Sequence, residues 1–169
     1  NHYRPQIVAS HVVNRLRLTR RGYFIASLHR EENVDNKERL TSLVGALNML
    51  VETHNMPMIL STHPRTRKRL EAFGLTFDKR IQDMQPFGFH DYNNLQMHAY
   101  CAISDSGTIA EEASILGFPA ITPRDAIERP EGVDVGCVIV TGLDRNGILA
   151  AVTAIVNQFE VREAAGLNP

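Results

Sequence analysis

The chain has 169 residues, of which 43% are hydrophobic and 22% charged, and its formal net charge is −1 at pH 7. This length suits one compact domain with its own core, and the composition is that of a globular protein. A charge so near zero offers no basic surface for nucleic acid or anionic lipid, and no apolar run is long enough to span a bilayer, so we expect neither nucleic acid nor a membrane as a partner.

Short apolar runs alternate along the chain with stretches whose apolar residues recur at three- and four-residue steps, which predicts alternating strands and helices. In chain order the expected elements are a lead-in segment at 1–20, a strand at 23–28, a helix at 36–54 capped by residue 35 or 36, a strand at 58–61, a basic helix at 65–72, a strand at 81–84, a helix at 92–99, a strand at 100–104, a helix at 107–116, strands at 119–122 and 137–140, and a last helix from about 144. This alternation is typical of an α/β sandwich with a mostly parallel sheet.

The run at residues 104–112 is the most informative segment. It reads Ser-Asp-Ser-Gly-Thr-Ile-Ala-Glu-Glu, so that a predicted strand leads through a Ser-Gly turn into a helix. Unpaired N–H groups and the positive end of the helix dipole favour a phosphate there, and Gly107 lets an anion approach the backbone. Glu112 could reach the hydroxyls of a ribose. The run indicates a nucleotide site, although Asp105 or Ser106 as a simple helix N-cap would produce the same pattern.

Polar side chains follow four of the predicted strands. They occupy residues 29–33, 63–65, 105–107 and 123–131. In a parallel sheet the carboxyl ends of the strands share one edge, and ligands bind beyond that edge where the strand order reverses. The opposite edge carries no comparable set, so the pattern favours a nucleotide site over scattered surface charge.

Cys101 and Cys137 each lie in an apolar run. They are predicted to be buried free thiols, which fits a reducing compartment such as the cytoplasm. The histidines outside the edge motifs lack the spacing of metal ligands, so no metal site is predicted. The chain begins without methionine, and we expect it to be part of a longer protein.

Four motifs, in the same order, resemble those of the non-hydrolysing UDP-N-acetylglucosamine 2-epimerases. They are Leu-His-Arg-Glu-Glu-Asn at 28–33, His-Pro-Arg at 63–65, the run at 104–112 and Glu-Arg-Pro-Glu at 128–131. The resemblance extends from about Tyr3 to the last helix. It implies a Rossmann-like three-layer sandwich at residues 21–169, the C-terminal UDP-binding half of a glycosyltransferase-B arrangement. Residues 1–20 would then be the connector from an N-terminal domain that this chain lacks.

The resemblance also implies an isomerase reaction. UDP is eliminated from the sugar to leave a 2-acetamidoglucal and is added back with the opposite configuration at C2, without a cofactor. The family's catalytic carboxylates lie on the N-terminal domain, so this chain alone is expected to be inactive. The whole enzyme is expected to be a cytoplasmic homodimer that serves the synthesis of cell-surface polysaccharide precursors.

Roles for single residues follow from the same resemblance. His29 is implied as the catalytic residue at the diphosphate, where Arg129 also binds. Ser106 and Gly107 would contact the phosphate, Glu112 the ribose, and Tyr92 the uracil through its backbone amide and carbonyl. Arg30 and His63 would contact a second UDP-sugar in members with an allosteric site.

One motif departs from the family pattern. The usual His-Arg-Arg-Glu-Asn is His-Arg-Glu-Glu-Asn here, which, with residues 34–36 and 63–69, resembles the branch that forms UDP-N-acetyl-L-fucosamine. UDP-N-acetylglucosamine ranks first as substrate because it is the commoner in the family. Two other functions stay open: the UDP-sugar-binding half of a glycosyltransferase, and a non-catalytic UDP-sugar sensor.

Overall fold

Six parallel strands form one sheet in the computed structural model, which describes residues 2–124 and 136–167. The strands are β1 (Phe24–Ser27), β2 (Met58–Ser61), β3 (Ile81–Met84), β4 (Cys101–Ser104), β5 (Ala120–Pro123) and β6 (Val138–Thr141). Their order is β3-β2-β1-β4-β5-β6, and every pairing between described strands is parallel. This is the doubly wound order, and it reverses between β1 and β4.

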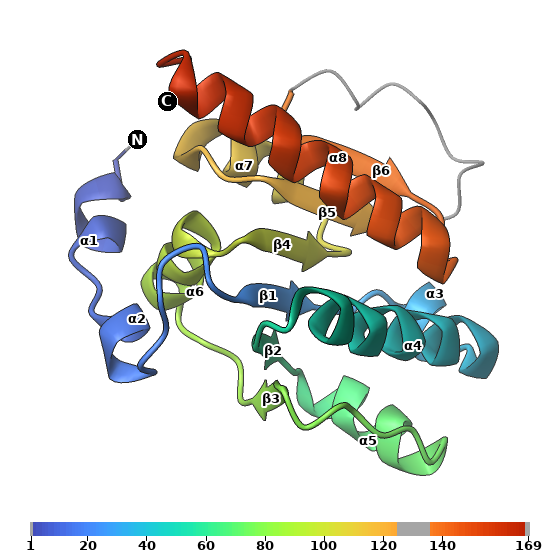
Figure 1. Cartoon of the computed structure of the whole chain (residues 1–169). Coiled ribbons are helices and arrows are strands. Elements are labelled where there is room, and N and C mark those ends of the chain that lie inside the picture. The colour runs from blue at the N-terminus through green and yellow to red at the C-terminus, as the bar shows by residue number, and fades with distance from the viewer. Residues whose placement is uncertain (1, 125–135, 168–169) are drawn as a thin grey trace.

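Helices cover both faces of the sheet (Figure 1). They are α1 (Arg4–Val8), α2 (Val12–Arg15), α3 (Glu31–Val34), α4 (Lys37–His54), α5 (Pro64–Ala72), α6 (Phe89–His98), α7 (Ile109–Leu116) and α8 (Arg145–Ala164). The expected α/β sandwich is therefore confirmed. Among the described residues no helix is both long and apolar enough to cross a membrane.

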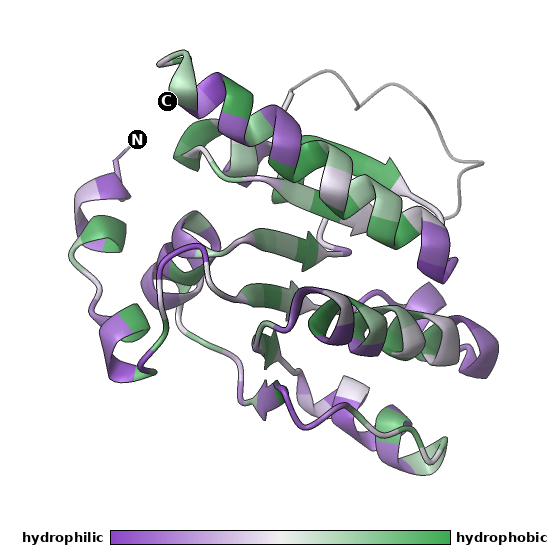
Figure 2. Ribbon diagram, in the orientation of Figure 1, coloured by the Kyte–Doolittle hydropathy of each residue, from purple (hydrophilic) through white to green (hydrophobic). Residues whose placement is uncertain are grey.

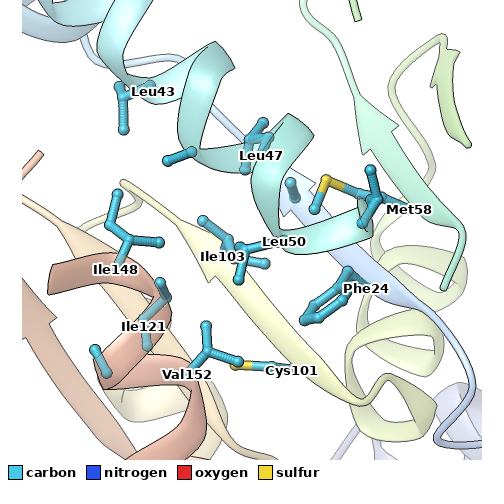
Figure 3. Close-up of a cluster of buried hydrophobic side chains, with 14 of the residues drawn as sticks. Phe24, Leu43, Leu47, Leu50, Met58, Cys101, Ile103, Ile121, Ile148 and Val152 are labelled. Atoms are coloured by element: carbon cyan, nitrogen blue, oxygen red, sulfur yellow. The ribbon is translucent and has the colours of Figure 1, made fainter. Parts of the chain in front are cut away.

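Two hydrophobic clusters lie on opposite faces of the sheet because neighbouring side chains of a strand point to opposite faces. Phe24 and Ala26 of β1 pack with α4 and α8, whereas Ile25 packs with α6 and α7. Figure 3 shows the first cluster, to which α4 contributes Leu47 and Leu50 and α8 contributes Val152. In Figure 2 the central strands β1 and β4 are mostly hydrophobic, and the helices around them mix hydrophobic and hydrophilic residues.

Most element ends follow recognisable local signals. Asn36 caps α4 by accepting a hydrogen bond from the Arg39 backbone N–H, with an N···O distance of 3.0 Å. Asp144 caps α8 in the same way through the Gly147 N–H, at 2.7 Å. Gly117 ends α7 with φ +74°, a left-handed conformation that glycine adopts without strain. The three predicted boundaries are confirmed.

The lead-in segment packs against the body of the domain. Ile7 of α1 and Val12 of α2 are buried in the cluster that contains α6. Polar contacts strengthen this docking, since Asn94 donates to the Ile7 carbonyl at 2.8 Å and Ser10 donates to Asp91 at 2.6 Å. Whether these residues connect to a further domain stays a prediction.

Candidate nucleotide site

The carboxyl ends of β1 and β4 lie side by side at the reversal of strand order. Ser27 is in register with Ser104, so the segments that follow these two strands emerge together. The arrowheads of both strands point to one edge in Figure 1, with α3 at that edge. The sheet thereby brings the motif that begins at His29 next to the one that begins at Asp105.

Asp105 has a different role from the expected one. Its carboxylate is fully buried and turns away from α7, toward the loop after β1. It accepts hydrogen bonds from the backbone N–H groups of His29 and Arg30, both at 3.0 Å, and from the side-chain amide of Asn33 at 3.1 Å. The interpretation of Asp105 as an N-cap is wrong, because these donors lie across the sheet edge and saturate the carboxylate.

His29 stands above this carboxylate. Its Nδ1 lies 3.1 Å from Asp105 Oδ1, while 49% of its side chain remains exposed. The imidazole is thus held on its inner side and open on its outer side. This is the arrangement that proton transfer or anion binding by a histidine requires.

The turn before α7 is built from hydroxyl groups. The Ser104 hydroxyl accepts from the Ser106 N–H at 3.1 Å, and the Ser106 hydroxyl accepts from the Thr108 N–H at 3.3 Å. The helix begins at Ile109 with Thr108 as N-cap, two residues after the predicted start, and neither Asp105 nor Ser106 caps it. These serine-bonded turns postpone the helix because the side chains compete for the backbone N–H groups.

Gly107 is exposed at the tip of this turn. A Cβ at this position would meet only the Arg30 guanidinium, at 3.8 Å. An anion can therefore approach the backbone between the turn and a cation. The first-turn N–H groups of α7 have no partner within the helix, which favours an anion at the same place.

Glu112 faces this turn. Its Oε1 accepts from the Thr108 hydroxyl at 2.7 Å, and that hydroxyl lies 3.0 Å from the Ser106 hydroxyl. The predicted phosphate and ribose contacts are thus linked through Thr108, which sequence reasoning missed. Glu111 is exposed, whereas Glu112 is half-buried. Both line a mostly apolar hollow of about 220 Å³ between α1, α6 and α7.

Two arginines place positive charge beside the turn. Arg30 Nε donates to the Asp105 carbonyl at 2.6 Å. Arg124, at the end of β5, donates to the Ser106 carbonyl at 3.3 Å, and its buried Nε has no partner among the described residues. Sequence analysis included Arg124 in the polar segment 123–131 after the strand at 119–122, but it assigned this residue no individual role. Arg129, the predicted diphosphate contact, lies outside the described residues.

Tyr92 enters the site from α6. Its backbone N–H donates to the Gly88 carbonyl at 2.9 Å, so it is not free for a uracil in this conformation. Burial is the main reason why the pKa of the Tyr92 phenol is raised, and Glu112 adds to the effect. The hydroxyls of Ser27 and Ser104 are near enough to favour ionisation, yet the phenol makes no hydrogen bond with a described residue.

The remaining predicted contact, His63, lies beyond β2 at the start of α5. Its Nδ1 accepts from the Arg65 N–H at 3.2 Å, which makes it the N-cap of that helix. Arg65 binds Glu31 and Asp35. The bonds of Arg65 and Arg69 to Asp35 hold the pKa of this carboxyl below its ordinary value. Ion pairs thus tie α3 to α5 beside Arg30. No group of possible metal ligands occurs among the described residues.

Known proteins resemble both the sequence and the fold. The UDP-N-acetylglucosamine 2-epimerase of Methanocaldococcus jannaschii is 43% identical over 141 residues, which are 80% of this chain and 38% of that protein. A solved structure of that organism's enzyme in complex with UDP-GlcNAc and UDP has a TM-score of 0.79 at 37% identity, and the match covers 90% of this chain and 44% of that one. A heptosyltransferase of E. coli has a TM-score of 0.57 at 13% identity over 83% of this chain and 46% of that one, a likeness of fold alone.

These likenesses confirm the expected half of a glycosyltransferase-B arrangement. The chain spans about two fifths of the length of the curated relatives it matches. Residues 1–168 match the sequence family described as UDP-N-acetylglucosamine 2-epimerase. The sequence match and the shared fold lead to one conclusion: the chain belongs to the UDP-N-acetylglucosamine 2-epimerase family.

Proposed function

We propose that the chain is the UDP-binding half of a cofactor-free 2-epimerase that acts on UDP-N-acetylglucosamine. The observation that carries this proposal is the gathering of His29, the Ser106–Gly107 turn and Glu112 around the ends of two adjacent strands, in a member of this family. A relative whose structure contains UDP-GlcNAc and UDP supports the choice of ligand.

The ligand would lie across the end of the sheet. The turn and the first N–H groups of α7 hold the diphosphate, with Arg124 and Arg129 adding positive charge. Glu112 accepts hydrogen bonds from the ribose hydroxyls. Tyr92 borders the uracil.

In the proposed reaction the C1–O bond to UDP breaks as a proton leaves C2, which gives the 2-acetamidoglucal. UDP then adds back at C1 and a proton returns to the opposite face of C2. His29 acts beside the diphosphate, where negative charge grows as UDP departs. The carboxylates that act at C2 are proposed to come from an N-terminal domain.

The whole protein is proposed to be a cytoplasmic homodimer that supplies precursors for cell-surface polysaccharides. Cys101 and Cys137 are buried free thiols, which agrees with a reducing compartment. Arg30 and His63 are proposed contacts of a second UDP-sugar at an allosteric site.

The Glu31 departure resembles the branch that forms UDP-N-acetyl-L-fucosamine, but it lies in the UDP-binding half, and the sugar is proposed to be recognised mainly by the N-terminal domain. The Glu31 carboxylate binds Arg65 of α5, so the residue has a structural partner whatever the substrate. UDP-N-acetylglucosamine therefore stays first, with formation of UDP-N-acetyl-L-fucosamine as the alternative.

The test uses the whole protein, with the N-terminal domain, incubated with UDP-N-acetylglucosamine in D₂O. We expect NMR to show deuterium at C2 and the appearance of the C2 epimer. Turnover of only the 6-deoxy sugar nucleotide from which UDP-N-acetyl-L-fucosamine forms would change the substrate but keep the mechanism. Transfer of the sugar to an acceptor, or tight binding without any exchange at C2, would contradict the epimerase proposal.

A further inference from the structure

The contacts of Asp105 are arranged for an ionised carboxylate. Both of its oxygens receive N–H donors: Oδ1 lies 3.0 Å from the His29 backbone nitrogen, and Oδ2 lies 3.0 Å from that of Arg30. The side chain is fully buried, so water does not compete for these bonds. An ionised carboxylate is only an acceptor, and every partner of Asp105 other than His29 Nδ1 is necessarily a donor.

An ionised Asp105 therefore favours an imidazole whose nearer nitrogen carries the hydrogen. We propose that Asp105 is a positioning residue that holds His29 in the Nδ1–H tautomer and leaves Nε2 free to face the ligand. Nδ1 lies 3.1 Å from Oδ1, an ion-pair distance at which the negative charge of the carboxylate favours a hydrogen on Nδ1. Nε2 lies across the ring from this contact, on the half-exposed side of the residue.

A second layer holds the carboxylate in place. Asn33, which is fully buried, donates from Nδ2 to Asp105 Oδ2 at 3.1 Å. Its own Oδ1 accepts from Arg39 Nη2 at 3.1 Å, so both ends of the amide are engaged and its orientation is set. Asp105 therefore cannot rotate away from the imidazole without breaking this chain of hydrogen bonds.

In the proposed reaction, the tautomer of His29 determines which ring nitrogen transfers the proton. With Nδ1 already protonated, Nε2 is the nitrogen that can accept a proton or return one at the departing UDP. This step rests on the proposed function, because it assumes that His29 acts in the reaction. The tautomer itself does not depend on that assumption.

The tautomer can be measured directly on this chain. In a long-range ¹H–¹⁵N spectrum at mildly alkaline pH, where imidazoles are neutral, we expect His29 Nδ1 to resonate as a protonated nitrogen and Nε2 as an unprotonated one. The His29 signals are those that disappear from the spectrum of the His29→Asn variant. A His29 with its hydrogen on Nε2, or averaged over both nitrogens, would overturn the proposal.

Asp105→Asn tests the consequence in the whole enzyme. Oδ2 accepts from Arg30 N, Asn33 and, at 3.2 Å, His29 N, so the asparagine oxygen should stay there. The His29 N–H, which also donates to Oδ1 at 3.0 Å, keeps its bond to the oxygen at Oδ2. The asparagine NH₂ should then face His29 Nδ1. That amide favours the other tautomer, and we expect kcat to fall roughly 10²- to 10⁴-fold with little change in KM, as for the comparable substitution in a serine protease. The matched control is Glu32→Gln, an exposed carboxylate of α3 that pairs with Arg30, for which we expect kcat within about twofold.

A double substitution separates positioning from a merely structural role. If Asp105 acts through His29, Asp105→Asn should reduce kcat no further in a His29→Asn background, whereas multiplied losses would contradict the proposal. If circular dichroism shows that the Asp105→Asn variant does not fold, the tautomer measured in the unsubstituted chain decides whether the proposal holds. An inactive whole enzyme with the Nδ1–H tautomer would refute the proposed function and leave this inference standing.

Discussion

At the scale of single residues, the site combines two carboxylates with opposite surroundings. Asp105 is fully buried, and protein donors surround both of its oxygens. Glu112 is half-buried, and among the described residues its hydrogen-bond partner is the Thr108 hydroxyl. Asp105 therefore holds the neighbouring loops in place, whereas Glu112 can still accept hydrogen bonds from a ligand.

This contrast predicts different effects for two neighbouring glutamates. Glu112→Ala should weaken UDP binding about tenfold or more, because a hydrogen bond to a charged group is worth roughly 1.5–3 kcal/mol. Glu111→Ala is the matched control and should change the affinity less than about twofold. Calorimetric titration of this chain with UDP measures both, and equal losses would mean that the ribose lies elsewhere.

Sequence reasoning selected His29, Ser106 and Glu112, and the fold brings these residues to one edge of the sheet. It could not predict what Asp105 does. Asp105 and His29 are 76 positions apart, and they meet only because β1 lies beside β4 in the sheet. Strand order is a non-local property that periodicity does not reveal, and a carboxylate before a helix has an ordinary local explanation as a cap.

At the scale of elements, most strands and helices could be predicted because apolar runs and caps define them locally. β2 and β3 have the predicted bounds, and α4 and α8 begin after the predicted caps. The start of α7 was missed, since the hydroxyls of Ser104 and Ser106 bind backbone N–H groups that a helix would otherwise use. The four-residue helix α3 was also missed, because its residues show no repeating apolar pattern.

The start of α7 carries the next prediction. Thr108→Val keeps the shape of the side chain but removes the hydroxyl that joins Ser106 to Glu112. Without this partner the Glu112 carboxylate is held less well, and the preference for UDP over 2′-deoxy-UDP should fall about fivefold, the equivalent of about 1 kcal/mol. Thr108→Ser restores the hydroxyl and should keep the preference. Competition binding on this chain gives both ratios, and an unchanged ratio in the valine variant would exclude an orienting role.

At the scale of the whole molecule, the sheet has a complete core on each face. One core lies under α4 and α8, and the other lies under α1, α2, α6 and α7. Each is built from residues within the described part of the chain. Neither therefore depends on contacts from the domain that we propose to lie upstream.

We accordingly expect the chain to fold alone, to bind UDP weakly and to lack epimerase activity. The chain should fold because it contains both cores, and it should bind UDP weakly because it carries only one half of the proposed site. It should be inactive because the proposed catalytic carboxylates belong to the other half. Cooperative urea unfolding tests the first point, and titration with UDP tests the second. Exchange of the C2 proton of UDP-N-acetylglucosamine in D₂O, catalysed by this chain, would contradict the third.

The all-parallel sheet has a kinetic consequence. Parallel neighbours cannot be joined by a tight turn, so formation of the β1–β4 pair must close the long intervening chain that contains β2 and β3, at a large cost in chain entropy. The ligand site rests on that pair and so should mature late in folding. A partly folded chain in which β1 and β4 are not yet paired would lack the ligand site. A nucleotide that binds the native state should therefore stabilise the whole domain against both thermal unfolding and proteolysis.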